Sequence, residues 1–138
     1  MLLMKTVLFV CVHNAGRSQM AEAFVNQFAK EQELPIRGES AGTMMGKDLN
    51  PMAVKVMQEI GISMDGQAPR QINQDLVDRA ERVITMGCGV DADACPAKFL
   101  VTDDWGLDDP AGQPIEKVRA IRDQIKDKVE ALLNEMTS

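Results

Sequence analysis

Aromatic side chains are scarce in this chain of 138 residues, which has no tyrosine, one tryptophan and four phenylalanines. The sequence therefore offers few side chains that could line a deep aromatic recognition pocket. Basic residues are also in the minority, because 15 lysines and arginines stand against 21 aspartates and glutamates, giving a net charge of −6. We therefore expect no nucleic acid partner and no attraction to an acidic membrane surface. An anionic substrate would have to be captured by a local site.

Long hydrophobic runs are missing as well. The apolar residues at 1–10 are too few to span a bilayer, and they lack the charged start and the small-residue cleavage site of a signal peptide. We expect them to form a strand, and we expect a cytoplasmic protein without a membrane partner. Length and composition predict a single domain over residues 1–138 with a core of its own. We also expect a monomer.

Cysteine is present three times, at Cys11, Cys88 and Cys95. An odd number of cysteines in a cytoplasmic chain does not suggest a framework of structural disulfides. Catalytic or redox use is the better interpretation.

Strand and helix patterns alternate along the chain. Short apolar runs predict four strands, and amphipathic or capped stretches predict the helices between and after them. We expect strands at 5–11, 36–41, 82–86 and 98–102 and helices at 17–30, 52–60, 74–79 and 115–136. This order predicts an α/β fold with three layers, in which a four-stranded parallel sheet is flanked by helices. Sites in such sheets lie at the carboxyl ends of the strands.

The loop after the first predicted strand is the most informative stretch. Cys11 ends the strand, five residues follow, and Arg17 and Ser18 open a helix. Backbone N–H groups in such a loop, the helix N-terminus and the fork of Arg17 would together hold a tetrahedral oxyanion. The same field would lower the pKa of the Cys11 thiol, whose thiolate is the nucleophile. The alternative is a buried core cysteine with an arginine on the helix surface.

Each residue of this loop has an expected part. The residues predicted to bind the anion are Val12, His13, Asn14, Ala15, Gly16, Arg17 and Ser18. The amide of Asn14 is expected to brace the loop through neighbouring backbone, and Ser18 to donate to the sulfur of Cys11. His13 is interpreted as a tolerated loop residue in preference to a group that tunes Cys11.

An acidic, turn-rich segment occupies residues 103–112. A leaving oxygen needs a proton, which a carboxylic acid near the thiolate can supply. Asp109, followed by the rigid Pro110, is the candidate, ahead of Asp103, Asp104 and Asp108. The alternative is a solvated acidic turn.

The stretch with Cys88 and Cys95 leaves three hypotheses open. It could be a redox pair, a zinc site formed with Cys11 and His13, or two incidental surface cysteines. In a helix, cysteines seven apart would be about 10.5 Å apart along the axis, whereas a disulfide needs α-carbons roughly 4.4–6.8 Å apart. A redox pair would therefore have to unwind or loop. We favour this pair, because zinc sites usually have closer ligand spacing and zinc would occupy Cys11.

Four motifs together resemble arsenate reductases of the low-molecular-weight tyrosine phosphatase fold. They are residues 11–23 (CVHNAGRSQMAEA), 39–42 (ESAG), 88–96 and 105–112 (WGLDDPAG). The resemblance spans nearly the whole chain in the right order, although the first motif is shared with the phosphatases themselves. It implies a low-molecular-weight tyrosine phosphatase-like domain that reduces arsenate.

The resemblance also implies a role for each cysteine. Cys11 attacks arsenate, which the loop amides and Arg17 hold, while Asp109 protonates the departing oxygen. Cys88 then attacks the sulfur of the adduct, which releases arsenite and leaves a Cys11–Cys88 disulfide. Cys95 converts it to Cys88–Cys95, and an external dithiol reduces that bond by thiol–disulfide exchange. The dithiol is usually thioredoxin, for which glutaredoxin with glutathione could substitute, and no further cofactor is expected.

Some members of this family bind potassium beside the loop. Groups resembling Asn14, Glu22 and Ser40 and a further carboxylate provide the ligands. Where we expect that carboxylate, residues 69–71 read Pro-Arg-Gln. The positive charge of Arg70 would oppose or replace the cation, which puts a potassium site in doubt, and we expect no other metal.

Two rival functions stay open at this point. A low-molecular-weight protein tyrosine phosphatase would share Cys11, Arg17 and Asp109, but it needs no Cys88 or Cys95 and usually carries aromatic residues at the rim of the site. Weak phosphatase activity is expected in either case. A non-enzymatic oxyanion or redox sensor would bind anions without turnover.

Overall fold

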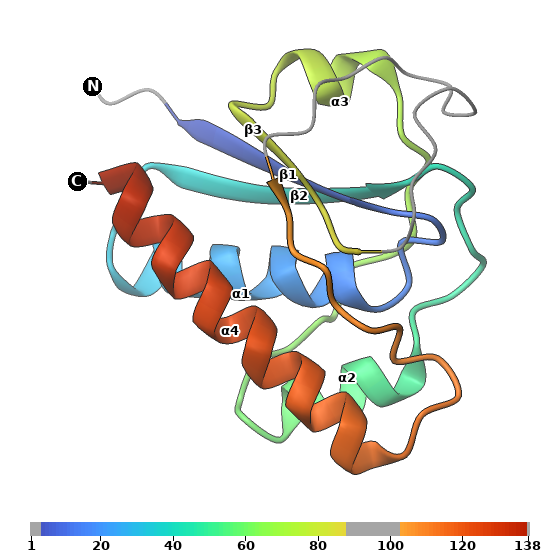
Figure 1. Cartoon of the computed structure of the whole chain (residues 1–138). Helices are drawn as coiled ribbons and strands as arrows, with labels where there is room; N and C mark the ends of the chain where they lie inside the picture. The colour runs from blue at the N-terminus through green and yellow to red at the C-terminus, as the bar shows by residue number, and fades with distance from the viewer. Residues whose placement is uncertain (1–3, 88–102, 138) are drawn as a thin grey trace.

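Four parallel strands form the sheet at the centre of the protein. The computed structural model describes residues 4–87 and 103–137. The strands are β1 (Lys5–Cys11), β2 (Ile36–Gly42), β3 (Arg82–Thr85) and β4 (Asp103–Asp104), in the order β2-β1-β3-β4 (Figure 1). Every strand pair is parallel, so the carboxyl ends of the four strands lie at the same side of the sheet.

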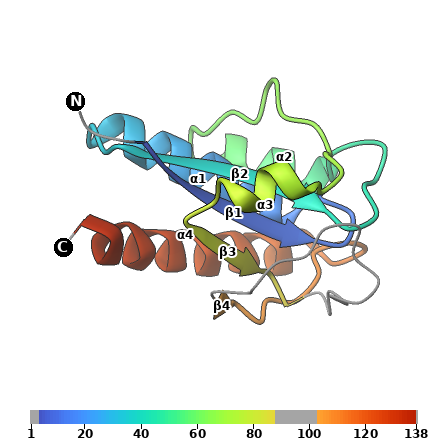
Figure 2. The same cartoon turned by 90° about the horizontal axis from the view of Figure 1, so that it is seen from above.

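Helices cover both faces of this sheet. They are α1 (Arg17–Glu31), α2 (Pro51–Gln58), α3 (Gln74–Asp78) and α4 (Ile115–Thr137). Figures 1 and 2 show α1, α2 and α4 on one side of the sheet and α3 on the other. The predicted three-layer α/β fold with a four-stranded parallel sheet is therefore confirmed.

β1 contributes to a core on each face. Val7, Phe9 and Cys11 belong to the larger cluster with α1, α2 and α4, whereas Leu8 and Val10 pack with a smaller cluster beneath α3. The four residues from Val7 to Val10 are completely buried. A parallel strand covered on both faces reads as a continuous apolar run, which is why the sequence identified it.

Side-chain caps fix where two helices begin. The Oδ1 of Asn50 accepts a hydrogen bond from the backbone N–H of Met52 at 2.9 Å, and Pro51 occupies the first helical position of α2. Asn73 caps α3 in the same way through Leu76, also at 2.9 Å. The predicted apolar stripe of α4 is buried as expected, with Val118, Ile121, Ile125, Val129, Leu132 and Leu133 in the core.

Most predicted boundaries lie within one residue of the structure, and two regions differ by more or in type. The helix predicted at 52–60 ends at Gln58, because the N–H groups of Ile60 and Gly61 bond carbonyls three residues back, at Met57 and Gln58, in a tight turn. The strand predicted at 98–102 lies outside the described residues. Asp103 and Asp104, predicted as part of an acidic loop, instead form β4, where they pair with Ile84 and Thr85 of β3.

None of the helices in the described ranges 4–87 and 103–137 is long and apolar enough to cross a membrane.

Candidate active site

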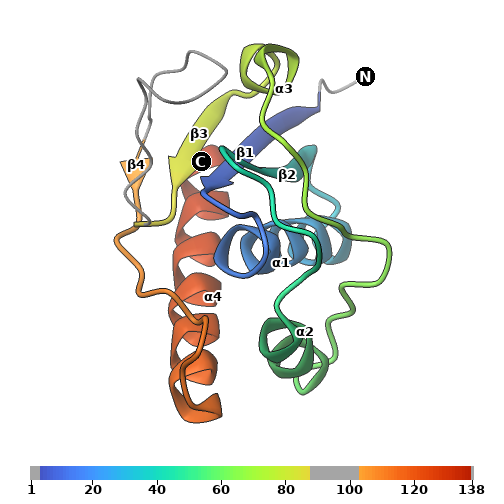
Figure 3. The same ribbon diagram turned by 90° about the vertical axis from the view of Figure 1, so that its right-hand side faces the viewer.

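A pocket of about 470 Å³ opens at the carboxyl edge of the sheet. Figure 3 faces this edge, where the segments after β1, β2 and β4 lie around the N-terminal end of α1. The pocket is lined by Cys11, Val12, His13, Asn14, Ala15, Gly16, Arg17, Asn50, Gly87, Leu107, Asp108, Asp109, Pro110 and Ala111. The predicted anion loop (residues 11–18) and the predicted acid segment (residues 103–112) therefore meet at one cavity.

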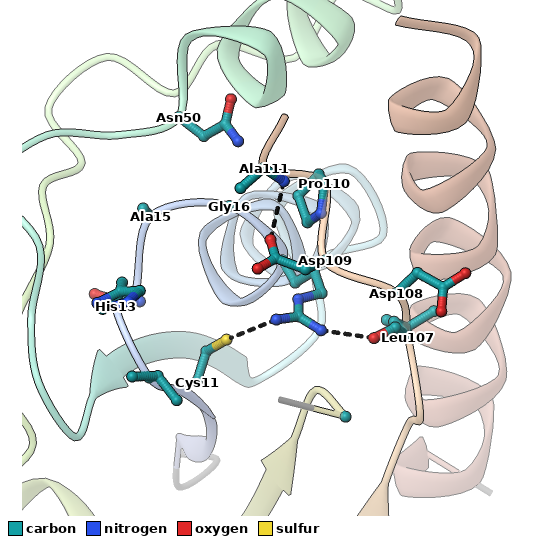
Figure 4. Close-up of a pocket in the computed structure, with 14 residues that line it drawn as sticks. Cys11, His13, Ala15, Gly16, Asn50, Leu107, Asp108, Asp109, Pro110 and Ala111 are labelled. Atoms are coloured by element: carbon teal, nitrogen blue, oxygen red, sulfur yellow. Dashed lines mark hydrogen bonds between the residues drawn. The ribbon is translucent and has the colours of Figure 1, made fainter. Parts of the chain in front are cut away.

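Cys11 and Arg17 are in direct contact at the base of this pocket. Cys11 ends β1 and is 7% exposed, and Arg17 begins α1 and is 5% exposed. Arg17 Nη2 donates to Cys11 Sγ at 3.5 Å (Figure 4). A guanidinium beside the sulfur favours the thiolate form. The alternative of an arginine on the helix surface is excluded.

Backbone carbonyls anchor the other side of the Arg17 guanidinium. Its Nη1 donates to Leu107 O at 2.6 Å and to Met86 O at 3.2 Å. These carbonyls belong to the segments that follow β4 and β3. These contacts hold the guanidinium of Arg17 with Nη2 on the side of Cys11.

Asn14 braces the loop, as predicted. It is completely buried and has a φ of 56°, a left-handed conformation that is uncommon outside glycine. Its Nδ2 donates to Ser18 Oγ at 2.8 Å, and its Oδ1 accepts from the backbone N–H of Arg70 at 2.8 Å. The bond from Ser18 to the Cys11 sulfur stays a prediction.

Two glutamines that the sequence reasoning missed complete this brace. Gln19, which is 1% exposed, donates through Nε2 to Asn14 Oδ1 at 2.9 Å and to Ala68 O at 2.9 Å. Gln67 Nε2 in turn donates to Gln19 Oε1 at 2.7 Å. A glutamine on the buried face of α1 was the available signal, but its partners Gln67 and Ala68 lie 48 and 49 residues away.

The end of β2 supports the loop from the other side. The loop passes so close to Gly42 that a side chain would not fit, because a Cβ there would be 2.5 Å from Val12 O. Backbone bonds run from Thr43 to Cys11 O and from Met44 to Val12 O. His13 Nδ1 lies 3.1 Å from Met44 O in an exposed setting, which agrees with its interpretation as a loop residue.

Of the four candidate acids, only Asp109 is both in the pocket and turned toward it. Its carboxylate accepts from Ala111 N at 2.9 Å, and Figure 4 shows it on the side of Cys11. Asp108 turns away and accepts from Lys117 Nζ at 2.6 Å, and this hydrogen bond lowers the pKa of Asp108 below its ordinary value. Asp103 and Asp104 are in β4 and do not line the pocket.

Cys88 and Cys95 lie outside the described residues, so no structural statement bears on their pairing. Gly87, which precedes Cys88, lines the pocket. Within residues 4–87 and 103–137, no three His, Cys, Asp or Glu side chains are grouped to hold a metal ion.

The residues that the resemblance implies for potassium make hydrogen bonds within the protein. The Oδ1 of Asn14 already accepts from Arg70 N and Gln19 Nε2, and Ser40 Oγ donates to Glu22 Oε1 at 3.0 Å. Burial raises the pKa of Glu22, while the hydrogen bond from Ser40 and the positive charge of Arg70 act against that shift. Asn14 Oδ1 and Glu22 Oε1 thus each accept from protein donors, and the positive charge of Arg70 acts on the Glu22 carboxylate.

The fold and the pocket together define a class of protein. It is an open, parallel α/β domain with a cysteine and an arginine at the base of a strand-loop-helix pocket, where an oxyanion can be bound. A comparison with known families identifies the family within this class. The model of the low molecular weight phosphotyrosine protein phosphatase family matches residues 6–138, so the chain belongs to this family.

Several proteins with similar sequences are named arsenate reductases. The chain is 38% identical over 132 residues to a putative arsenate reductase of Halobacterium salinarum, covering 92% of this chain and 89% of the relative. It is 37% identical over 134 residues to a glutaredoxin arsenate reductase of Synechocystis, covering 94% and 97%.

Solved structures agree with these relatives. An arsenate reductase in a phosphate-binding state superposes with a TM-score of 0.80 at 35% identity, over 96% of this chain and 98% of the other. A thioredoxin-dependent arsenate reductase of Corynebacterium glutamicum gives a TM-score of 0.76 at 29% identity, over 98% of this chain and 63% of the other.

Proposed function

We propose that this protein is an arsenate reductase that works through a relay of three cysteines, Cys11, Cys88 and Cys95. The observation that supports it most directly is the contact of Arg17 Nη2 with Cys11 Sγ, 3.5 Å apart at the base of the pocket. Asp109 lines the same pocket, with its carboxylate on the side of Cys11. This geometry suits attack by a thiolate on a bound oxyanion. The names of the relatives and of the superposed structures favour arsenate as that oxyanion.

The first step forms a sulfur–arsenic bond. The loop amides of residues 12–18 and the fork of Arg17 bind the arsenate oxygens. The Cys11 thiolate attacks the arsenic, and one arsenic–oxygen bond breaks. Asp109 gives its proton to the departing oxygen, which leaves as water. The anion remains bound because Arg17 and the N-terminus of α1 balance its charge.

The second step transfers two electrons to arsenic. The Cys88 thiolate attacks Cys11 Sγ, and a sulfur–sulfur bond forms. The electron pair of the sulfur–arsenic bond stays on arsenic, which leaves as arsenite. Cys95 then attacks Cys88 and frees Cys11 as a thiolate. The oxidation is thereby moved from a cysteine that is 7% exposed to a Cys88–Cys95 disulfide.

The cycle needs a two-electron reductant from outside the chain. Thioredoxin is the proposed dithiol, and glutaredoxin with glutathione is the alternative, because one relative and one superposed structure are named for these two systems. Both donors operate where thiols are kept reduced, so the proposed setting is the cytoplasm. A monomer without nucleic acid or membrane partners suffices for the reaction.

A weaker phosphomonoesterase activity is the second candidate. The pocket has room beyond a tetrahedral anion, and phosphate ester hydrolysis would need only Cys11, Arg17 and Asp109. Among the described residues that line the pocket there is no phenylalanine, tyrosine or tryptophan to stack on a phosphotyrosine ring. We therefore expect aryl phosphates to be poor substrates.

The test is a coupled assay of the whole protein. Arsenate is supplied with thioredoxin, thioredoxin reductase and NADPH, and NADPH oxidation is compared with hydrolysis of p-nitrophenyl phosphate. We expect arsenate-dependent oxidation of NADPH and slower ester hydrolysis. Ester hydrolysis without arsenate reduction by either thioredoxin or glutaredoxin would establish the phosphatase. Anion binding without any turnover would establish a sensor.

A further inference from the structure

Asp104 makes two hydrogen bonds that the proposed reaction does not use. Although exposed in β4, its Oδ1 accepts from Thr85 Oγ1 at 2.6 Å and from the backbone N–H of Gly87 at 2.8 Å. Thr85 is the last residue of β3 and is 7% exposed. One carboxylate oxygen therefore ties the end of β3, and the residue two beyond it, to β4.

The bond to Gly87 fixes a tight crossing of two backbones. Gly87 has a φ of 83°, and a Cβ at this position would be 2.5 Å from Leu107 N and 2.7 Å from Gly106 C. Beside this crossing, Leu107 N donates to Met86 O at 3.2 Å. The segment after β3 and the segment after β4 are thus held against each other at Gly87.

The same crossing carries the carbonyls that hold Arg17. Met86 precedes Gly87, and Leu107 is the residue against which Gly87 packs. Their carbonyl oxygens are the two acceptors of Arg17 Nη1, at 3.2 and 2.6 Å. The orientation of the guanidinium consequently depends on the relative position of these two segments.

We infer that Asp104 is a positioning residue for the oxyanion site, acting through Gly87 and the carbonyls of Met86 and Leu107 on the fork of Arg17. The inference rests on the proposed use of Arg17 as an anion ligand. Loss of the Asp104 carboxylate leaves the Gly87 N–H without its acceptor, so the carbonyls shift relative to Cys11. Arg17 then pays an orientation cost each time an anion binds.

The test measures anion affinity without any need for turnover. Inorganic phosphate should protect Cys11 from iodoacetamide, and the dependence of this protection on phosphate concentration would give a Kd. For Asp104→Ala we expect the Kd to rise by about tenfold or more, and kcat for p-nitrophenyl phosphate to fall as well. Asp104→Asn keeps an oxygen acceptor for Gly87 and should recover most of both values.

Two controls separate positioning from general damage. Asp103→Ala removes the neighbouring carboxylate, which accepts from the backbone N–H of Asp104, and should change the Kd by less than about twofold. Thr85→Val deletes one of the two bonds to Asp104 in a buried, isosteric way. It should raise the Kd for phosphate by a smaller factor than Asp104→Ala does. If Asp104→Ala does not fold, the Kd of Thr85→Val tests the inference instead.

A double-mutant comparison tests the route through Arg17. In an Arg17→Lys background, whose side chain has no fork to orient, Asp104→Ala should add no further loss of phosphate affinity. An unchanged Kd for Asp104→Ala, or an equal loss in both backgrounds, would overturn the inference. Absence of arsenate reduction in the wild type would instead contradict the proposed function and leave this phosphate measurement intact.

Discussion

Gly16 and Pro110 are the point where the anion loop and the acid segment touch. A Cβ at Gly16 would be 3.0 Å from Pro110 Cγ, a closer approach than ordinary side-chain packing allows. Pro110 is buried, and it follows Asp109 directly. The absence of a side chain at position 16 therefore determines how close the carboxylate of Asp109 comes to the anion loop.

Gly16→Ala should separate catalysis from anion binding. The added methyl group would push Pro110 outward and carry Asp109 with it, so we expect kcat for p-nitrophenyl phosphate to fall by about tenfold or more. Phosphate should still protect Cys11 from alkylation. Gly46→Ala is the matched control, because its Cβ would be 3.5 Å from His13 O, an ordinary contact. A normal kcat in Gly16→Ala would show that Asp109 is not positioned through Pro110.

Arg17→Lys should abolish most turnover although the charge is kept. A lysine cannot make the bidentate contact to an oxyanion, and it cannot bond Leu107 O while also contacting Cys11 Sγ. We expect a loss of kcat/KM of about a hundredfold or more, measured with both arsenate and p-nitrophenyl phosphate. Arg119→Lys changes an exposed arginine that pairs with Glu59 on the surface, and it should be near normal. Near-normal activity of Arg17→Lys would remove Arg17 from the transition state.

The parts of the site that are continuous in sequence could be predicted from it. Cys11 and Arg17 lie at the two ends of one loop, so the strand before it and the helix after it were enough to bring them together. The Asn50-Pro51 pair likewise marked the start of α2 through local capping chemistry. In these cases the interacting groups are neighbours in the chain.

The parts that the sequence did not reveal depend on contacts between distant segments. Gln67 braces the loop only because its segment crosses beside Gln19, 48 residues away in sequence. Asp104 resembled a turn residue because two consecutive aspartates disfavour a strand. Its place in β4 is set by the hydroxyl of Thr85 and the N–H of Gly87, which no local pattern encodes.

Glu22→Gln should stabilise the protein above pH 4.5. Burial raises the pKa of Glu22 above its ordinary value of 4.5, so the folded protein holds the proton more tightly than the unfolded chain. The stability that the protonated form contributes is full below pH 4.5 and is lost as pH rises through the folded pKa. A glutamine, whose carbonyl oxygen can still accept from Ser40, removes this loss.

Urea unfolding of the wild type and of Glu22→Gln at several pH values measures this effect. The advantage of the variant should be small near pH 4.5 and should grow toward pH 8, and Glu31→Gln serves as an exposed control on the same helix. A wild type that gains stability over Glu22→Gln as pH rises would mean that the carboxylate is favoured in the folded state. Arg70 and Ser40 would then outweigh burial.

The proposed thiolate at Cys11 predicts selective alkylation. Arg17 contacts its sulfur, and the N-terminus of α1 adds positive potential, so iodoacetamide should modify Cys11 well below pH 8. Arsenate, phosphate and sulfate should slow this reaction, because each would occupy the pocket above the sulfur. Peptide mass mapping assigns the label. Equal modification of all three cysteines, unaffected by the anions, would contradict the site.

The cysteine relay predicts different failures for its two later members. Cys88→Ser should block the release of arsenite, because no other thiol is assigned to attack the Cys11–arsenic adduct. Cys95→Ser should permit one round and then stop with Cys11 and Cys88 joined. Wild type treated with arsenate but no reductant should accumulate a Cys88–Cys95 disulfide. Arsenite yield per enzyme and mass mapping of disulfide-linked peptides distinguish these states.

Hydrolysis of p-nitrophenyl phosphate is the internal control for the relay, since it would need only Cys11, Arg17 and Asp109. Cys88→Ser and Cys95→Ser should therefore keep the hydrolytic activity of the wild type while they lose thioredoxin-coupled turnover of arsenate. Loss of both activities would indicate damage to the pocket, whose edge includes Gly87, next to Cys88. If both variants instead reduce arsenate catalytically with thioredoxin, the electrons do not pass through Cys88 and Cys95, and the three-cysteine mechanism is wrong.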